Sequence, residues 1–249
     1  MKKLILRISF LCILSAISIN KLFAQAAPDS ISVQTDVNQI TANFYKAVGQ
    51  ESRLYNGHEY LPYDPHLKGN ALFPYDAQSW LIGEVNYDGI VYKGVPMMYD
   101  INKDVVVVLL YNKFSMFSLL SERVADFSLG GHHFVRLTAD QLANNKVDMT
   151  VGFYDQLYGG TTEVLASRKK TLQNSSNAVA APETRFISTD DYYIKKSGTY
   201  YKVSGQGSIL KVLKDKKSAI QQYFKQNHIR FKDNPEDAMA KMAYFYDHN

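Results

Sequence analysis

The sequence predicts an α+β fold: a mainly antiparallel sheet or partial barrel of about 8–10 strands, with one N-terminal helix and two C-terminal helices. Three observations lead to this prediction. Residues 54–203 are rich in β-branched and aromatic residues that are interrupted by short turn sequences. Apolar residues before and after this region recur instead at the spacing of amphipathic helices. Strands that are joined by such short turns must run antiparallel.

The first 24 residues have the pattern of a cleavable secretory signal peptide. Lys2, Lys3 and Arg7 give this segment a basic start. An apolar run of about a dozen residues follows, which is shorter than the roughly 20 residues that a membrane-spanning helix needs. The segment closes on the small residue Ala24, so we expect cleavage there. The protein would then be exported to the periplasm, the outer-membrane surface or the extracellular medium.

Cleavage after Ala24 would change the charge and the thiol content of the chain. The sequence has 28 Lys+Arg and 24 Asp+Glu, and four of the bases but none of the acids precede residue 25. The mature chain would therefore be neutral, which argues against a nucleic-acid partner. The only cysteine, Cys12, would also leave. A cysteine-free mature chain has no disulfide and no thiol chemistry.

Residues 25–249 are expected to form a single α+β domain. Its N-terminal segment, residues 25–50, contains a helix over about 36–48 that Thr35 can cap. The apolar stripe of this helix consists of Val37, Ile40, Phe44 and Val48. Gly49 follows the last turn, where glycine commonly ends a helix.

Residues 54–203 are expected to form a β meander. The pair Asp88-Gly89 between two apolar runs is a strong hairpin signal. The β-branched run over residues 105–111 predicts a buried central strand. Further strands are expected at 114–120, 124–128, 133–137, 149–157, 163–169, 192–195 and 199–203. Residues 174–184 lack periodicity and are mostly small, so they predict a flexible loop within the sheet.

The C-terminal part, residues 208–247, is expected to be helical. A first helix is predicted over about 208–227, and a second begins at Pro235 after the capping residue Asn234. The outer side of the first helix carries Lys211, Lys214, Lys217 and Lys225. Such a basic stripe can contact anionic lipid headgroups, which would give a peripheral membrane contact, or an acidic partner. The alternative is a face that is simply solvated.

The histidines and carboxylates do not form a recognisable catalytic or metal-binding motif. His132 and His133 are adjacent, and adjacent side chains on a strand point to opposite faces. A second group, around His58 and His66, lacks the spacing that places two imidazoles on one helical face. The paired carboxylates that glycoside cleavage would need are available from Glu84, Asp88, Asp100 and Asp104. Most of these lie at expected turns, where Asp is common for backbone hydrogen bonding. The sequence predicts no metal and no cofactor, and it favours a non-enzymatic protein over an enzyme.

Tyrosine is the distinctive excess of this sequence, with 18 residues. The candidate binding surface that we name from the sequence consists of Tyr87, Tyr92, Tyr99, Tyr154 and Tyr158. Exposed tyrosine rings can stack on sugars or anchor a protein partner. The alternative is ordinary packing on half-buried strands, for which tyrosine is also well suited.

Three stretches of sequence carry a resemblance to a known group of proteins. They are Leu54-Tyr55-Asn56-Gly57-x-Glu59-Tyr60, Tyr87-Asp88-Gly89-x-x-Tyr92-x-x-Val95-Pro96-x-x-Tyr99-Asp100 and Gly152-Phe153-Tyr154-Asp155-x-Leu157-Tyr158. With the lysine-rich C-terminal helix, they resemble a group of secreted β-rich proteins of Bacteroidetes-type bacteria. The resemblance covers most of the mature chain. It implies export and a β-rich fold, and it carries no activity and no site residue.

Three functions follow as hypotheses. The leading one is an exported envelope or secreted protein that is a non-enzymatic binding or structural domain, with an unknown protein, glycan or lipid as its ligand. The first alternative is a carrier of a lipid or other apolar ligand inside a curled sheet. The second alternative is a hydrolase that acts on glycans or peptides.

Overall fold

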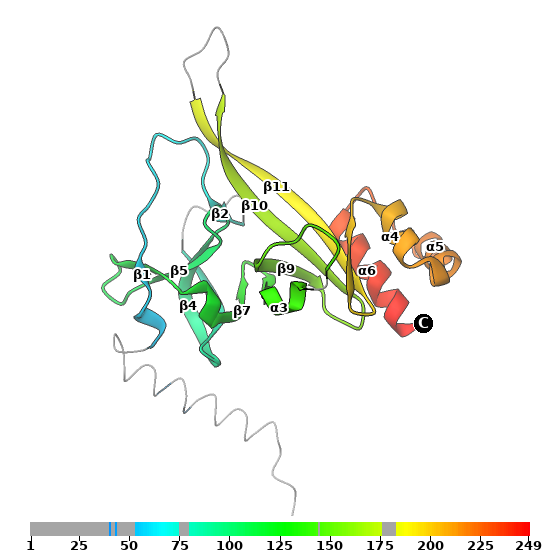
Figure 1. The fold of residues 1–249 in the computed structure, drawn as a ribbon, viewed down its shortest axis with the longest axis horizontal. Coiled ribbons are helices and arrows are strands. Elements are labelled where there is room, and N and C mark those ends of the chain that lie inside the picture. Colours follow the sequence, from blue (N-terminus) through cyan, green and yellow to red (C-terminus); the bar gives the residue numbers. More distant parts are fainter. Residues whose placement is uncertain (1–39, 41–42, 44–52, 75–79, 144, 176–182) are drawn as a thin grey trace, which may run out of the picture. The chain divides into compact units, whose positions relative to one another are not determined.

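The computed structural model describes residues 40, 43, 53–74, 80–143, 145–175 and 183–249 (Figure 1). The chain divides into two units, Met1–Val48 and Gly49–Asn249. All strands and helices given below belong to the second unit. The predicted signal peptide, and all of the helix predicted over 36–48 except residues 40 and 43, lie outside the described residues. None of the helices in the described ranges has the length and apolarity that crossing a bilayer requires.

The described strands form one sheet of twelve strands, in which all named neighbours are antiparallel. The strands are β1 His58–Glu59, β2 Leu72–Phe73, β3 Leu81–Tyr87, β4 Ile90–Asp100, β5 Val105–Leu109, β6 Met116–Ser118, β7 Val124–Leu129, β8 His132–Leu137, β9 Gly152–Tyr158, β10 Glu163–Ser175, β11 Glu183–Lys196 and β12 Thr199–Val203. Their order is β1-β6-β5-β4-β3-β7-β8-β9-β10-β11-β12, and β2 pairs with β4. The order begins at β1 and ends at β12 without returning, so the sheet is open.

Four α-helices are present in the described residues, and three of them follow the sheet. They are α3 Ala139–Leu142, α4 Gln206–Val212, α5 Lys217–Gln226 and α6 Pro235–His248. Short 3₁₀ turns occur at η3 Arg53–Tyr55, η4 Ser121–Arg123 and η5 Lys214–Lys216. Asn234 caps α6, because its Oδ1 accepts a hydrogen bond from the backbone N–H of Asp237 at 3.1 Å.

The fold class predicted from the sequence is wrong. The described chain is mostly one open sheet of twelve strands, where we expected a partial barrel or sheet of about 8–10 strands in an α+β fold. Strands β1 and β2 have only two residues each, so they show no alternation that a sequence pattern could detect. The single helix expected over 208–227 is divided into α4 and α5 by η5, because Leu213 leaves the helical conformation at φ −93° and ψ 35°.

The longest hairpin of the sheet is formed by β10 and β11, which pair from Glu163↔Lys195 to Ser175↔Glu183. The predicted strand at 163–169 is therefore only the first half of β10. Leu172 lies opposite Phe186 and Thr171 opposite Ile187, and such aromatic and β-branched pairs stabilise neighbouring strands. The flexible loop predicted at 174–184 is wrong at both ends of that range, because residues 174, 175, 183 and 184 belong to the hairpin. The rest of the range lies outside the described residues.

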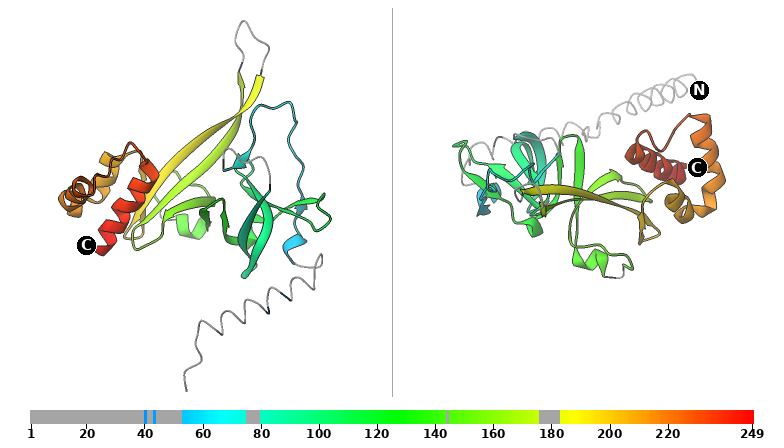
Figure 2. Two further views of the ribbon diagram at one scale, coloured as in Figure 1. Left: turned by 180° about the vertical axis from the view of Figure 1, so that it is seen from behind. Right: turned by 90° about the horizontal axis from the view of Figure 1, so that it is seen from above.

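Both faces of this hairpin are covered at the end near its first residues. Val164 and Leu165 follow each other on β10, so their side chains point to opposite faces of the hairpin. Both are buried, which shows that both faces are covered here. Val164 packs with apolar residues of α4, α5 and α6, which gather at this end of the hairpin (Figures 1 and 2). Leu165 packs on the other face with Tyr154, Tyr193 and Tyr200.

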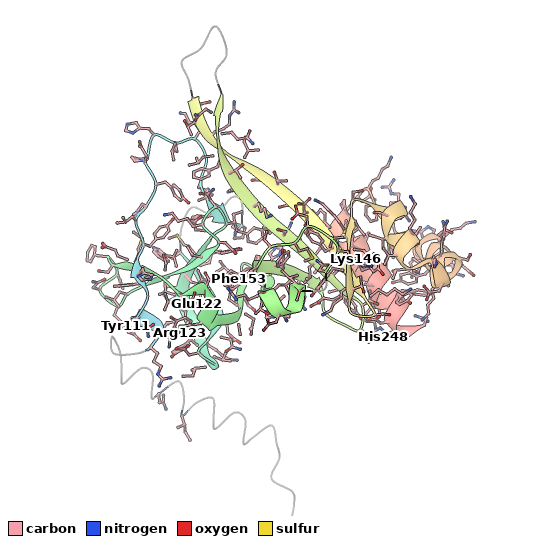
Figure 3. The ribbon with its side chains drawn as sticks, viewed as in Figure 1. Tyr111, Glu122, Arg123, Lys146, Phe153 and His248 are labelled. Carbon is pink, nitrogen blue, oxygen red and sulfur yellow. The ribbon has the colours of Figure 1, made fainter. Side chains whose placement is uncertain are left out.

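A second part of the core is an aromatic cluster near the middle of the sheet. It consists of Phe73, Tyr99, Phe127, Phe134 and Phe153, all at most 4% exposed. The ring of Phe134 stacks on Phe127 at a centroid distance of 4.7 Å. Edge-to-face contacts join the same ring to Phe73 and Tyr99. Phe153 on β9, which is labelled in Figure 3, contacts Phe127 edge to face. This geometry adds to the free energy gained by burying the rings.

Candidate functional site

The five tyrosines named from the sequence do not form an exposed surface. Tyr87, Tyr92, Tyr99 and Tyr154 are at most 5% exposed and belong to the core. Tyr158 is half-buried, and its hydroxyl donates a hydrogen bond to Asp247 Oδ2 at 3.1 Å. Strand alternation explains this result, since these rings lie at positions whose side chains face the interior. The four buried rings have no face that a glycan or a protein partner could contact.

The histidines named from the sequence lie apart or have other partners. His66 contacts Asp64 at the protein surface, with 2.7 Å between Nδ1 and Oδ1. His133 Nδ1 lies 3.1 Å from Ser128 Oγ, and His132 Nδ1 lies 2.7 Å from Asp155 Oδ2. Within the described ranges, no group of three or more His, Cys, Asp and Glu residues could hold a metal ion.

The four carboxylates named from the sequence do not converge on one site. Glu84 forms a surface ion pair with Lys93, and Asp88 forms a partly buried one with Arg123. Asp100 is fully buried and accepts a hydrogen bond from the hydroxyl of Tyr60 at 3.0 Å. Asp104 lies in a polar groove of about 280 Å³, where it accepts a hydrogen bond from the hydroxyl of Tyr99 at 2.6 Å. Burial raises the pKa of Asp104, although the hydrogen bonds from Tyr99 and from the Phe153 N–H oppose the shift.

The densest set of interacting charges is a cluster that joins α6 to the sheet, here called the α6 clasp. It consists of His132, Asp155, Arg168, Asp190, Tyr192 and Glu236. Arg168, on β10, has only 4% of its side chain exposed. Its guanidinium binds Glu236 through two hydrogen bonds of 2.6 and 2.9 Å, and Asp155 through Nη2 at 2.5 Å. This forked geometry is the one in which arginine binds carboxylates most strongly.

The pKa shifts in the α6 clasp concern Glu236 and Arg168, and both favour the charged form. Burial alone would raise the pKa of Glu236, but hydrogen bonds from Arg168 and Tyr192 lower it below its ordinary value. Burial would also lower the pKa of Arg168, yet its bonds to Glu236 and Asp155 raise it. Since Glu236 is ionised at neutral pH and bound on both oxygens, it acts as an anchor for the first turn of α6 and is poorly suited to donate a proton.

These shifts predict how the protein responds to acid. The ordinary pKa of Glu236 is 4.5, and its pKa in the folded protein is lower. The stabilisation that this group provides is therefore complete above pH 4.5 and is lost as the pH falls through the lower pKa. We expect Glu236→Gln to flatten the decrease in the free energy of unfolding between pH 5 and pH 3. Urea unfolding of both proteins at several pH values measures this, and parallel curves would contradict the assignment.

The outer side of the helices α4 and α5 with the turn η5 is the most strongly charged surface segment. Residues 206–232, all of them described, contain one acid, Asp215, and seven bases. Five of the bases lie on these elements, namely Lys211, Lys214, Lys216, Lys217 and Lys225. The other two follow α5: Lys232, and Arg230, which forms an ion pair with Asp233 at 2.8 Å. The inner side of the same elements is apolar and buried through Ile209, Leu213, Ile220 and Phe224. The division between the two sides follows from helical periodicity.

Four of these lysines are exposed on the helices and the turn, and we call them the basic face: Lys211, Lys214, Lys217 and Lys225. Lys216 differs, because its Nζ donates a hydrogen bond to the carbonyl of Tyr246 at 2.8 Å. The single acid, Asp215, binds Lys196 Nζ at 2.5 Å and the hydroxyl of Tyr246 at 2.6 Å, and these bonds lower its pKa to about 2. The sequence indicated these four lysines because their spacing places them away from the apolar stripe.

The basic face stands out against the rest of the chain. Residues 25–249 contain 24 Lys+Arg and 24 Asp+Glu. Since residues 206–232 hold seven of these bases and one of the acids, the remainder holds 17 bases and 23 acids. None of the large apolar side chains that are exposed in the described residues lies within 206–232. The surface is therefore polar, positively charged and opposite in sign to the rest of residues 25–249.

A comparison of the chain with protein-family models, with curated proteins and with solved structures finds no match.

Proposed function

We propose that this chain is an exported, non-enzymatic protein of the cell envelope that works by binding, and that the basic face is its binding surface. The signal-peptide pattern supports export, as does the resemblance to secreted proteins of Bacteroidetes-type bacteria. The observation that carries the binding surface is the excess of five bases over one acid in residues 206–226, which contain α4, η5 and α5. A charge excess on one side of a neutral domain attracts partners of opposite sign and orients them.

The basic face rests on a firm support, which favours a binding role. The helices beneath it share a buried apolar core with β10, β11 and β12. The α6 clasp fixes the first turn of α6 to β9 and β10. Lys196, on β11, binds both the carbonyl of Val212 and the side chain of Asp215. The backbone that carries the lysines is therefore held in place, so only their side chains lose freedom when a partner binds.

The test is the distribution of the protein between cell fractions. In cells that produce the full chain, we expect the cleaved protein to sediment with the envelope at low salt and to be released at high salt. A variant with Lys211→Gln, Lys214→Gln, Lys217→Gln and Lys225→Gln should appear in the soluble fraction at low salt, because it lacks the four exposed charges.

The matched control removes four other exposed lysines from the same protein: Lys68→Gln, Lys93→Gln, Lys113→Gln and Lys146→Gln. This control has the same net charge as the first variant and should stay with the envelope. Equal release of the two variants would show that net charge, and not the basic face, determines retention. An uncleaved chain in the cytosol would contradict export itself.

A further inference from the structure

We infer that the partner of the basic face is an anionic phospholipid surface, and that binding is electrostatic without insertion. This inference rests on the proposed function, because it names the partner of the same surface. The charged groups that it uses are lysines, and a lysine ammonium is a compact point charge with no fixed fork geometry. Such charges suit many equivalent phosphates in the plane of a bilayer.

The residue types of the basic face favour a bilayer over a folded protein partner. Protein interfaces are enriched in Tyr, Trp and Arg and depleted in Lys. On α5, the exposed residues between Lys217 and Lys225 include Ser218, Gln221 and Gln222. None of these residues supplies the aromatic or arginine anchor on which protein partners usually depend. Among the described residues, the grooves found in the sheet region and beside α6 are not lined by the four lysines.

The lysines of the basic face lie on three successive elements. Lys217 and Lys225 are eight residues apart on α5, which places them about 80° apart around the helix and about 12 Å apart along its axis. Lys211 lies on α4 and Lys214 on η5, the two elements that precede α5. Lysines this far apart can contact different lipid headgroups, and each lysine near an anionic bilayer raises partitioning by roughly fivefold.

The lack of exposed apolar residues separates this mode of binding from insertion. An interfacial amphipathic helix buries Trp, Phe or Leu among the acyl chains. On α5, Ile220 and Phe224 face the protein core and are at most 4% exposed, and Tyr223 is partly buried and stacks on Phe245. They are unable to reach the bilayer while the domain is folded. Binding should consequently follow the charge of the lipid and disappear at high salt.

The experiment uses the protein purified after export and vesicles of phosphatidylglycerol with phosphatidylcholine, compared with phosphatidylcholine alone. We expect sedimentation with the anionic vesicles only, and release at 1 M salt, where the screening length falls to about 3 Å. The variant without the four lysines of the basic face should lose about 1,000-fold in partitioning, and the control variant should lose far less. Thermal unfolding of both variants close to that of the original chain shows that they are folded.

The outcomes separate this inference from the proposed function. Equal vesicle binding by the two variants would overturn the inference, and so would binding that persists at 1 M salt. If the exported protein does not bind anionic vesicles but the basic face still determines retention with the envelope, the lipid is the wrong partner and the proposed function stands. If the protein does not bind anionic vesicles and the basic face does not determine retention with the envelope, both proposals are overturned.

Discussion

Replacing Arg168 with Met is expected to lower the free energy of unfolding by about 3–5 kcal/mol. The substitution removes one partner of a buried ion pair and leaves the carboxylate of Asp155, which is 1% exposed, with the imidazole of His132 but no arginine beside it. It also removes both hydrogen bonds that hold Glu236 at the start of α6. For a domain of about 200 residues, a loss of this size lowers the melting temperature by about 10 °C. Urea and thermal unfolding measure it.

Three further variants separate the effect of the α6 clasp from a general effect of losing an arginine. Arg185→Met changes an exposed arginine on the neighbouring strand β11 and should leave stability nearly unchanged. Arg168→Lys keeps the charge but loses the fork, so its loss should be intermediate. The combination of Arg168→Met with Asp155→Asn and Glu236→Gln should recover part of the loss, because no buried carboxylate is then left without a cation. Equal losses in Arg168→Met and Arg185→Met would contradict this account.

The α6 clasp shows why part of the candidate site was not predicted from the sequence. Arg168 is separated from Asp155 by 13 residues and from Glu236 by 68. A single sequence gives no signal for contacts between side chains so far apart. Glu236 also had a sufficient local explanation, since acids are common in the first turn of a helix. One signal was available: Arg168 has the same strand parity as Val164 and Ala166, which places a charge on a buried face.

Local elements were predicted more accurately than the overall architecture. The hairpin at Asp88-Gly89 is confirmed: Tyr87 pairs with Ile90, and both turn residues have positive φ, at 55° and 75°. Such turns depend on neighbouring residues alone, so the sequence is enough to predict them. The number of strands and the open edges depend on pairing between distant segments. The two-residue strands β1 and β2 exist only because β6 and β4 lie beside them.

The two candidate surfaces differ in the same way: the position of the lysines depends on local sequence, and the position of the tyrosines depends on distant packing. The outward position of the four lysines follows from helical spacing within one segment, and the exposed positions in the structure agree with it. The tyrosines required knowledge of which strand face is buried. Residue type does not supply this, because tyrosine suits both buried and half-buried positions of a sheet. The sequence therefore contains no sign that four of the five named rings lie in the core.

The second large effect is expected at the aromatic cluster. Phe134→Ala should lower the free energy of unfolding by about 3–5 kcal/mol, because it removes a fully buried ring and leaves a cavity. Rings from three other strands contact Phe134, namely Phe73, Tyr99 and Phe127. The close fit of these rings limits how far the site can collapse into the cavity. Chemical denaturation measures the loss.

Phe114→Ala is the matched control, since the same atoms are removed from a side chain that is 85% exposed. Its free energy of unfolding should change by less than about 0.5 kcal/mol. Comparable losses in the two variants would mean that the ring of Phe134 is not in the core of the sheet. Phe134→Ala should lower the free energy of unfolding, but the envelope should retain the protein that remains folded. Such a result would separate stability from binding. That result is expected, because the aromatic cluster and the basic face share no residue.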